Sequence, residues 1–498
     1  MSSAALILSV AVLGVTAMGF LAARWGGANL NGLEEWALGG RSFGTIVSWF
    51  LLGGDLYTAY TFIAVPALVY GIGALGFFAV PYATIAYPIA LIVLTRFWGV
   101  ARRRGYVTTA DFVRDRYGDR GLEVAVALTG VVAALPYIAL QLVGMRAVFG
   151  RFEMLGAGGA LPALTASFVL LAAYTYTSGL RAPALIAFVK DALIYVTVIA
   201  AIVFIPARLG GWGHIFALSQ LVLARRPHPS SILLTPPQYF TYATMALGSA
   251  LSLFIYPHSI TSVLAAKSRE VVRRNAALLP IYSLLLGLLA LLGYCAVAAG
   301  INVKDTSNVV PLLFARYFPE WFTGVAYSAI VIGALVPAAI MCIGAANLFA
   351  SNVFREFSPA RSPIETVVAK ALTVAICAVA LLFVVFVPVP YAIDFQLLGG
   401  ALMLQIFPAF VLGLWTRWFH PKALLAGWAC GLVASCAMAY ASGFSANFTL
   451  QASLISLTGF IALYSLILNL FVSVAVTLLL RAVRVDAGVD RTSAADFA

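Results

Sequence analysis

The chain has 498 residues, of which 63% are hydrophobic and only 10% are charged, and its mean hydropathy is +1.01. A soluble domain carries about 25% charged residues, so this composition excludes an ordinary soluble fold. The net charge of +12 could indicate nucleic-acid binding. However, the basic residues lie in short connections between apolar runs, which is typical of membrane proteins, and no nucleic-acid partner is expected.

Thirteen apolar runs are long enough to cross a bilayer, which takes about 20 residues. They cover residues 4–23, 45–70, 76–98, 122–149, 161–178, 183–206, 238–264, 275–299, 322–350, 366–387, 391–415, 423–442 and 453–481. The first has no basic residues ahead of it and no convincing cleavage site, so we expect a retained helix and not a signal peptide. The sequence predicts an all-α integral membrane protein with about 13 transmembrane helices, forming one transmembrane domain over residues 1–498.

The connections between these runs divide the basic residues unequally. One side collects 22 of the 30 Lys and Arg residues, seven lie opposite, and Lys190 lies inside a run. By the positive-inside rule the N-terminus faces out and the C-terminus is cytoplasmic. The connection 206–238 is long enough for a gating loop, although a passive connector is the simpler interpretation, and the polar tail 485–498 is expected to fray.

The second run is interrupted at residues 53–61, GGDLYTAYT. A carboxylate such as Asp55 costs roughly 2.5–3.5 kcal/mol near the bilayer centre, so it is rarely kept without a partner or a role. The two glycines and the Tyr and Thr residues indicate a helix that unwinds. Such breaks line cavities, and in secondary transporters they form the substrate and ion sites. The sequence therefore predicts a transporter.

The break in the second run supplies most of the candidate substrate-binding residues. We expect its unwound backbone N–H groups to attract a carboxylate, with hydroxyl groups orienting it. The alternative is that these polar residues only satisfy a kinked backbone. The candidates here are Gly54, Asp55, Tyr57, Thr58, Tyr60 and Thr61.

Other runs add weaker candidates. Gly248, Ser249 and the sequence YPH at 256–258 allow the seventh run to break as well, which makes Tyr256 and His258 candidates, although a buried histidine is more often a packed residue. Gln141 and Gln396 are also candidates. They are weaker ones, because neighbouring helices can satisfy an amide without a ligand. All five cysteines lie in apolar runs without CxxC spacing, so neither a metal site nor a disulfide framework is expected, and no cofactor is implied.

Several motifs resemble a known family. Residues 36–42 (WALGGRS) and 108–118 (TTADFVRDRYG) resemble signatures of the sodium/solute symporter family. Within that family, residues 54–62 (GDLYTAYTF), 179–183 (GLRAP), 256–258 (YPH) and 273–280 (RRNAALLP) resemble the bacterial monocarboxylate permeases.

The resemblance implies the LeuT-type architecture. Two inverted five-helix repeats would occupy residues 45–206 and 238–415, with an extra helix at 4–23 and two more at 423–481. The implied protein is a symporter in the bacterial inner membrane that imports small monocarboxylates such as lactate, pyruvate, short-chain acids or alanine by alternating access. The substrate would bind between the second and seventh runs, and no obligatory protein partner is evident.

The coupling site is where the sequence departs from the family pattern. Sodium symporters of this fold place two adjacent Ser or Thr hydroxyls on the ninth run, whereas the alignment that begins at Ala338 and Ala339 puts Cys342 and Ile343 there. A thiol is a poor ligand for a hard cation. Lys190 and Asp191 on the sixth run, together with Asp55, are therefore candidates for the coupling site.

Proton-coupled relatives of the wider fold carry a lysine on that same helix, so a proton is favoured over sodium as the coupling ion. A structural Lys–Asp pair, a lysine that reaches the cytoplasm and sodium coupling stay open. A membrane-embedded enzyme or a sensor is a distant alternative, because no HExxH, GxSxG or Walker pattern is present and no signalling domain follows residue 481.

Overall fold

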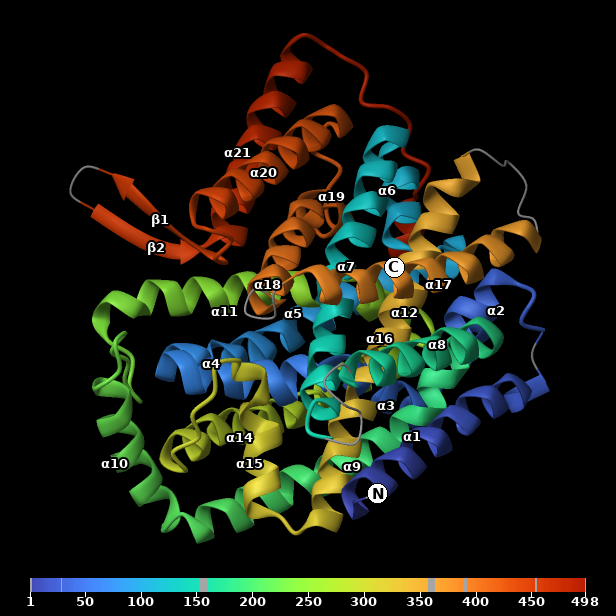
Figure 1. The fold of residues 1–498 in the computed structure, drawn as a ribbon. Helices are drawn as coiled ribbons and strands as arrows, with labels where there is room; N and C mark the ends of the chain where they lie inside the picture. Colours follow the sequence, from blue (N-terminus) through green and yellow to red (C-terminus); the bar gives the residue numbers. More distant parts are fainter. Residues whose placement is uncertain are drawn as a thin grey trace.

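The computed structural model describes residues 2–27, 29–152, 159–356, 363–387, 392–452 and 455–497, and most of them are helical (Figure 1). Within these ranges, eleven helices are long and apolar enough to cross a bilayer, and one further pair forms a bent span. The stretch 60–104 counts once among the eleven, although its 45 residues would extend about 68 Å, more than twice the bilayer core. It therefore holds the second part of the broken second span and, in α5, the whole of the next one, and the expected thirteen is an approximate count.

The first half of the chain contains both long spanning helices and short connecting helices. They are α1 (Ser3–Leu21), α2 (Leu33–Leu38), α3 (Thr45–Leu56), α4 (Val65–Ile72), α5 (Ala79–Arg104), α6 (Thr109–Tyr117), α7 (Arg120–Phe149), α8 (Ala160–Ser178) and α9 (Arg181–Arg208). A π-helical turn, Tyr60–Ala64, precedes α4, and the chain reverses at Gly73, whose φ of 63° lies in the left-handed region that glycine tolerates.

The second half repeats this mixture of long and short helices and adds two strands. Its elements are α10 (Gly211–Ala224), α11 (Tyr239–Leu253), α12 (Pro257–Leu264), α13 (Arg269–Leu278), α14 (Pro280–Ala298), α15 (Val309–Tyr317), α16 (Glu320–Asn352), α17 (Pro363–Phe386), α18 (Ala392–Met403), α19 (Phe407–Phe410), α20 (Pro421–Ala441), β1 (Asn447–Ala452), β2 (Ile455–Phe460) and α21 (Ile461–Ala482). The connection 206–238 was expected to be a loop, and it contains the helix α10.

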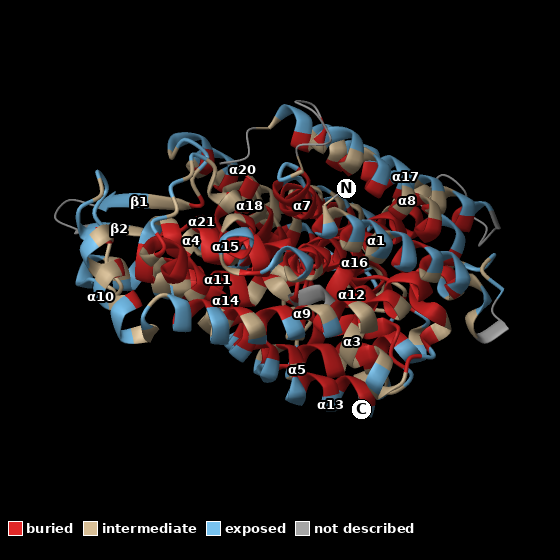
Figure 2. Ribbon diagram, turned by 60° about the horizontal axis from the view of Figure 1, so that its bottom comes forward, coloured by how far each residue is buried: buried red, intermediate tan, exposed pale blue. Residues whose placement is uncertain are grey.

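The core of the protein surrounds α16. Every residue in the central apolar window of α16 is buried, whereas only 28% of the corresponding windows of α1 and α21 are buried. Figure 2 shows the same pattern, with buried residues concentrated on α7, α12 and α16 and exposed residues toward the outside. The peripheral helices thus face their surroundings with apolar side chains, as a lipid environment requires.

The last expected span, 453–481, is only partly helical. Strands β1 and β2 pair antiparallel ahead of α21, with Thr449 opposite Thr458 and a hydrogen bond of 2.8 Å between their hydroxyl groups. Polar and apolar side chains alternate along these strands, which is the strand period and not the helical one. The helix therefore begins at Ile461, and the strand pair forms a hairpin on the same side of the protein as α10 (Figure 1).

The motif at 108–118 forms α6 and the turn that leads into it. The hydroxyl of Thr108 accepts from the backbone N–H of Asp111, whose carboxylate accepts in return from the N–H of Thr108, so the two residues form a capping box. At the end of α16, the side-chain amide of Asn352 donates to Asp111 and to Glu123, each at 2.9 Å. The motif thus fixes the turn before α6 against α7 and α16.

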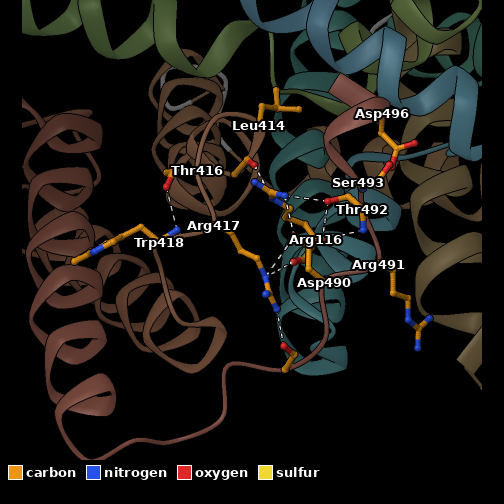
Figure 3. Close-up of polar contacts among 12 residues, drawn as sticks. Arg116, Leu414, Thr416, Arg417, Trp418, Asp490, Arg491, Thr492, Ser493 and Asp496 are labelled. Carbon is orange, nitrogen blue, oxygen red and sulfur yellow. Dashed lines mark hydrogen bonds and ion pairs between the residues drawn. The ribbon is translucent and has the colours of Figure 1, made fainter. Parts of the chain in front are cut away.

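The C-terminal tail is docked on the protein and does not extend away from it, contrary to the sequence prediction (Figure 3). Asp490 lies 2.9 Å from the guanidinium of Arg116 and 3.5 Å from that of Arg417, and Asp496 lies 2.8 Å from Arg104. The composition predicted a disordered tail because it is polar and short. Each of the arginines that hold it, Arg104, Arg116 and Arg417, lies at least 73 residues from its partner in the tail, so these contacts were not visible in the sequence.

Candidate functional site

The first helix break lies between α3 and α4. At Tyr57 the backbone leaves the helix with φ −90° and ψ 92°. The N–H of Ala59 donates to the side-chain oxygen of Gln141 at 2.9 Å, and the N–H of Tyr60 donates to the hydroxyl of Thr58 at 3.0 Å. The N–H groups of the two following residues donate to the carbonyl of Thr58.

These contacts contradict the expectation that the unwound N–H groups are free to hold a carboxylate. Four consecutive N–H groups after Thr58 already have partners within the protein. Thr58 and Gln141 therefore act as caps of the broken helix and not as groups that face a ligand. Both polar atoms of the Gln141 side chain thus have a partner within the protein, because its NH₂ also donates to the carbonyl of Tyr137 at 3.1 Å.

The second break lies between α11 and α12, which are bent by 47° relative to one another. Tyr256 precedes Pro257, the first residue of α12, and proline at this position has no N–H that would need a partner. Ser249 and Ser252 lie on the last turns of α11, just before the break. Both predicted breaks are thus present in the structure.

A central pocket lies between the two breaks. Its lining residues come from five helical spans and from the hairpin: Tyr60, Tyr82, Tyr137, Ser249, Ser252, Leu253, Tyr256, Gln396, Leu397, Gly400 and Phe460. The cavity volume is about 20 Å³, which is room for one or two water molecules. The pocket is therefore contracted compared with the several hundred Å³ of a typical ligand site.

Four polar atoms on the wall of this pocket are buried without a hydrogen-bond partner among the described residues. They are the hydroxyl oxygens of Tyr60, Ser249 and Tyr256 and the side-chain oxygen of Gln396. Burying such a group without a partner costs about 1–3 kcal/mol, so unpaired polar atoms are rare in proteins. Several of them facing one cavity, on both broken spans and α18, indicate a site for a small polar ligand.

The structure brings together only some of the predicted substrate-binding residues. Tyr60, Tyr256 and Gln396 line the central pocket. His258 is buried behind it, with its ring 5.3 Å from that of Tyr256, and Thr61 is also buried but does not line the pocket. The surroundings of Gly54 and the side chain of Asp55 lie outside the described part of the structure.

Sequence reasoning missed Tyr82, Tyr137 and Phe460. Aromatic residues are common in apolar helices, so nothing in their sequence context separates a pocket wall from ordinary packing. Only their positions around the two breaks single them out.

A second polar cluster surrounds Lys190 on α9. The ammonium group of Lys190 lies 2.7 Å from the carboxylate of Asp191, and both side chains are fully buried. The ammonium also donates to the backbone carbonyl of Tyr57 at 3.4 Å, at the limit of hydrogen bonding. Tyr282 donates its hydroxyl to Asp191 at 3.0 Å. We call Lys190, Asp191, Tyr57 and Tyr282 the Lys190 cluster.

Two sequence predictions concern residues of the Lys190 cluster, one about Tyr57 and one about Lys190. Tyr57, expected to orient the substrate, packs its ring 4.5 Å from that of Tyr282 and is absent from the central pocket lining. Lys190 contacts the carbonyl at the helix break, which is where the sequence placed its positive charge. Gly53 lets α3 approach the cluster, because a Cβ atom there would lie 1.9 Å from the hydroxyl of Tyr282.

Among the described residues, no contact joins Lys190 to the three coupling-site candidates on α16. Ala339, Cys342 and Ile343 are all fully buried. The sulfur of Cys342 lies 3.4 Å from that of Cys377 on α17, so it is directed to a neighbouring helix of the second half. Neither Ala339 nor Ile343 carries a polar side chain that could bind a cation.

Comparisons with known proteins decide the family. The model of the sodium:solute symporter family matches residues 36–431. The chain belongs to the sodium:solute symporter family. This symporter is 49% identical over 471 residues to a monocarboxylate transport permease protein of Rhizobium johnstonii, covering 94% of this chain and 95% of that protein. It is also 35% identical over 439 residues to the uncharacterized symporter YodF of Bacillus subtilis, covering 86% of each chain.

The fold of this symporter is also that of a solved structure. A substrate-bound, outward-open Na⁺-coupled sialic acid symporter covers 96% of this chain and 98% of its own, with a TM-score of 0.76 and 14% sequence identity. The predicted family and the LeuT-type helical membrane fold are therefore confirmed. The relatives are transporters, so this symporter is a multi-pass transporter and not an enzyme.

Proposed function

We propose that this symporter imports small monocarboxylates and that protons drive the import. The substrate class rests on the relative that shares 49% of its residues and is named a monocarboxylate permease. The central pocket supports it, because its lining offers hydroxyl donors and no charged side chain. Hydroxyl groups that donate to a carboxylate form short, charge-assisted hydrogen bonds.

The pocket also suggests how a substrate lies in it. The hydroxyls of Tyr60, Ser249 and Tyr256 donate to the carboxylate, since each is unpaired. The oxygen of Gln396 can only accept, so it suits a hydroxyl such as that of lactate or an ammonium such as that of alanine. Pyruvate and acetate lack such a donor, which predicts weaker binding of these two acids.

The coupling proposal rests on the ammonium of Lys190. In this position the positive charge of Lys190 contacts both the carbonyl of Tyr57, at the break between α3 and α4, and the carboxylate of Asp191 on α9. A lysine can lose its proton whereas a bound arginine cannot, so proton release would weaken the contact with the broken helix. Release would then favour one of the two access states, which is the differential interaction that coupling requires.

Sodium coupling is the second candidate, and one observation favours it. The carboxylate of Asp191 and the carbonyl of Tyr57 place oxygen atoms next to the ammonium of Lys190, and the hydroxyl of Tyr282 lies 3.0 Å from the same carboxylate. Oxygen atoms of this kind are the ligands that hard cations prefer. Should Lys190 move away, the remaining atoms offer part of a sodium site.

The proposed setting is the bacterial inner membrane. Arginines and lysines gather on the side of the protein where α5 and α6 meet the docked tail, so the positive-inside rule places that side in the cytoplasm. The N-terminus then faces out and the C-terminus is cytoplasmic. The proposed partners are the monocarboxylate and the lipid bilayer.

Uptake into proteoliposomes tests both parts of the proposal. Labelled lactate should accumulate when an inward proton gradient is imposed without sodium, and an inward sodium gradient at equal pH should add nothing. Lys190→Ala should abolish accumulation, and Lys190→Arg, which cannot deprotonate, should do the same. Lys370→Ala is the matched control, because Lys370 lies on the spanning helix α17 with its ammonium 5.7 Å over the ring of Tyr176 and outside the Lys190 cluster. Uptake that requires sodium at every pH would refute proton coupling.

A further inference from the structure

One residue of the central pocket comes from outside the helical spans that carry its other lining residues. Phe460 ends strand β2, just before α21, and its side chain lines the central pocket with only 1% of its surface exposed. The other lining residues lie on α5, α7, α11, α18 and the two breaks. The hairpin therefore contributes to a pocket that the core helices could form without it.

The hairpin is fastened to α11, the helix that carries Ser249 and Ser252. The hydroxyl of Thr241 donates to the carbonyl of Thr458 at 2.6 Å, and the N–H of Phe460 donates to the hydroxyl of Thr244 at 3.1 Å. These two contacts hold the end of β2 along one face of α11. The position of Phe460 is thus fixed by hydrogen bonds to main chain and side chain.

The base of the hairpin is also fastened to α18, the helix that carries Gln396. The carboxylate of Asp394 accepts from the N–H of Ala446 at 3.1 Å, and the carbonyl of Ala446 accepts from the N–H of Ile461 at 3.1 Å. Both ends of the hairpin are thereby connected to helices that line the pocket. The hairpin and the pocket wall form one packed unit.

The ring of Phe460 lies at the end of the pocket that is nearer the hairpin. A Cβ atom at Gly248 would lie 2.6 Å from a ring carbon of Phe460, so the ring rests directly on the backbone of α11. Gly248 precedes Ser252 by four residues, about 6 Å along the helix. Tyr256 lies deeper, eight residues beyond Gly248 at the break, so the ring faces the part of a ligand that points away from the Tyr256 hydroxyl.

We propose that Phe460 closes the outer end of the substrate pocket and sets the upper limit on the length of the substrate carbon chain. The proposal rests on the proposed function for its substrate, a monocarboxylate whose carboxylate lies toward the hydroxyls of Tyr60 and Tyr256. The hydrocarbon end of the acid then meets an apolar ring that has little room to move, because it is packed closely against Gly248 of α11 and Phe460 as a whole is only 1% exposed. A chain that is one or two methylene groups too long collides with the ring.

The first experiment tests the closure without any assumption about the substrate. Ser249→Cys is introduced into a protein in which Cys430 and Cys436, the two exposed free cysteines of the described part, are replaced by serine. A membrane-impermeant thiol reagent is added from the hairpin side of proteoliposomes. Labelling should be at least tenfold faster when Phe460→Ala is also present. Equal labelling rates with and without Phe460→Ala would overturn the closure.

The second experiment tests the chain-length limit. Unlabelled acetate, propionate, butyrate and valerate compete with labelled lactate for uptake. In the unaltered protein inhibition should weaken beyond three carbons, whereas in Phe460→Ala each added methylene should strengthen it, by about fourfold for a fully buried methylene. The same chain-length profile in both proteins would overturn the limit.

Controls separate these outcomes from misfolding and from failure of the proposed function. Phe471→Ala is the matched control, since Phe471 lies on α21 and is 70% exposed, and both of its profiles should equal those of the unaltered protein. Phe460→Leu gives a smaller enlargement if Phe460→Ala does not purify as a single species. If the unaltered protein transports no monocarboxylate but the labelling rates still differ, the proposed function fails and the closure by Phe460 stands.

Discussion

Replacing Lys190 by alanine should destabilise the protein in a way that depends on pH. The substitution leaves the carboxylate of Asp191 fully buried, with the hydroxyl of Tyr282 as its remaining hydrogen-bond donor among the described contacts. Breaking a buried ion pair by removing one partner costs about 3–5 kcal/mol. Asp191 can avoid the unpaired charge by binding a proton. That costs about 1.36 kcal/mol for each pH unit above the ordinary carboxyl pKa of about 3.9, or about 4 kcal/mol at pH 7 and about 1.5 kcal/mol at pH 5.

The stability loss of Lys190→Ala should therefore be large at pH 7 and about a third as large at pH 5. Thermal unfolding of the purified protein in detergent at the two pH values measures it, with Lys370→Ala as the control that loses a lysine but no ion pair. The double variant Lys190→Met/Asp191→Leu should recover most of the stability, because it removes both charges, but should not recover coupled transport. A Lys190→Ala variant that is as stable as the control, or whose loss is independent of pH, would refute the reasoning.

Three further outcomes follow from the described contacts. Tyr256→Phe removes a donor to the carboxylate and should raise the half-saturating lactate concentration roughly tenfold or more, whereas Tyr440→Phe, on a residue that is 78% exposed, should leave it unchanged in the same uptake assay. Gln141→Leu removes the cap of the first break and should cost about 1–3 kcal/mol, seen as a lower unfolding temperature with or without substrate; an unchanged temperature would show that the cap is dispensable. Asp490→Asn should release the tail to limited proteolysis, whereas Glu270→Gln, in an exposed ion pair, should give the same digestion pattern as the unaltered protein.

The broken helix illustrates how far local sequence reaches. Residues 53–61 predicted an interruption of the second run, and the structure places the break at Tyr57 and Thr58. The same residues suggested free N–H groups. The structure shows them capped, because Gln141 arrives from a helix 82 residues further along the chain. A sequence reveals that backbone donors lose their helical partners but not which distant side chain replaces those partners.

The central pocket shows which of its residues local sequence could identify and which it could not. Tyr60, Tyr256 and Gln396 could be proposed because each polar side chain stands out in an apolar run. Tyr82 and Phe460 could not, because an aromatic side chain in a membrane helix or a strand has no local feature that separates a pocket wall from packing. Tyr57 was assigned to the substrate and lies in the Lys190 cluster instead, since the direction of a side chain at an unwound position does not follow helical periodicity.

What the sequence determined by itself was the membrane fold, the two breaks and the presence of Lys190 and Asp191 within a span. These features depend on hydrophobicity, backbone propensity and charge, which act locally and are readable along the chain. The tertiary structure alone decided the capping of the break, the entry of the hairpin into the pocket and the docking of the tail. Each of these depends on groups that are distant in sequence and meet only when the helices pack, as when Asp490 meets arginines 374 and 73 residues away.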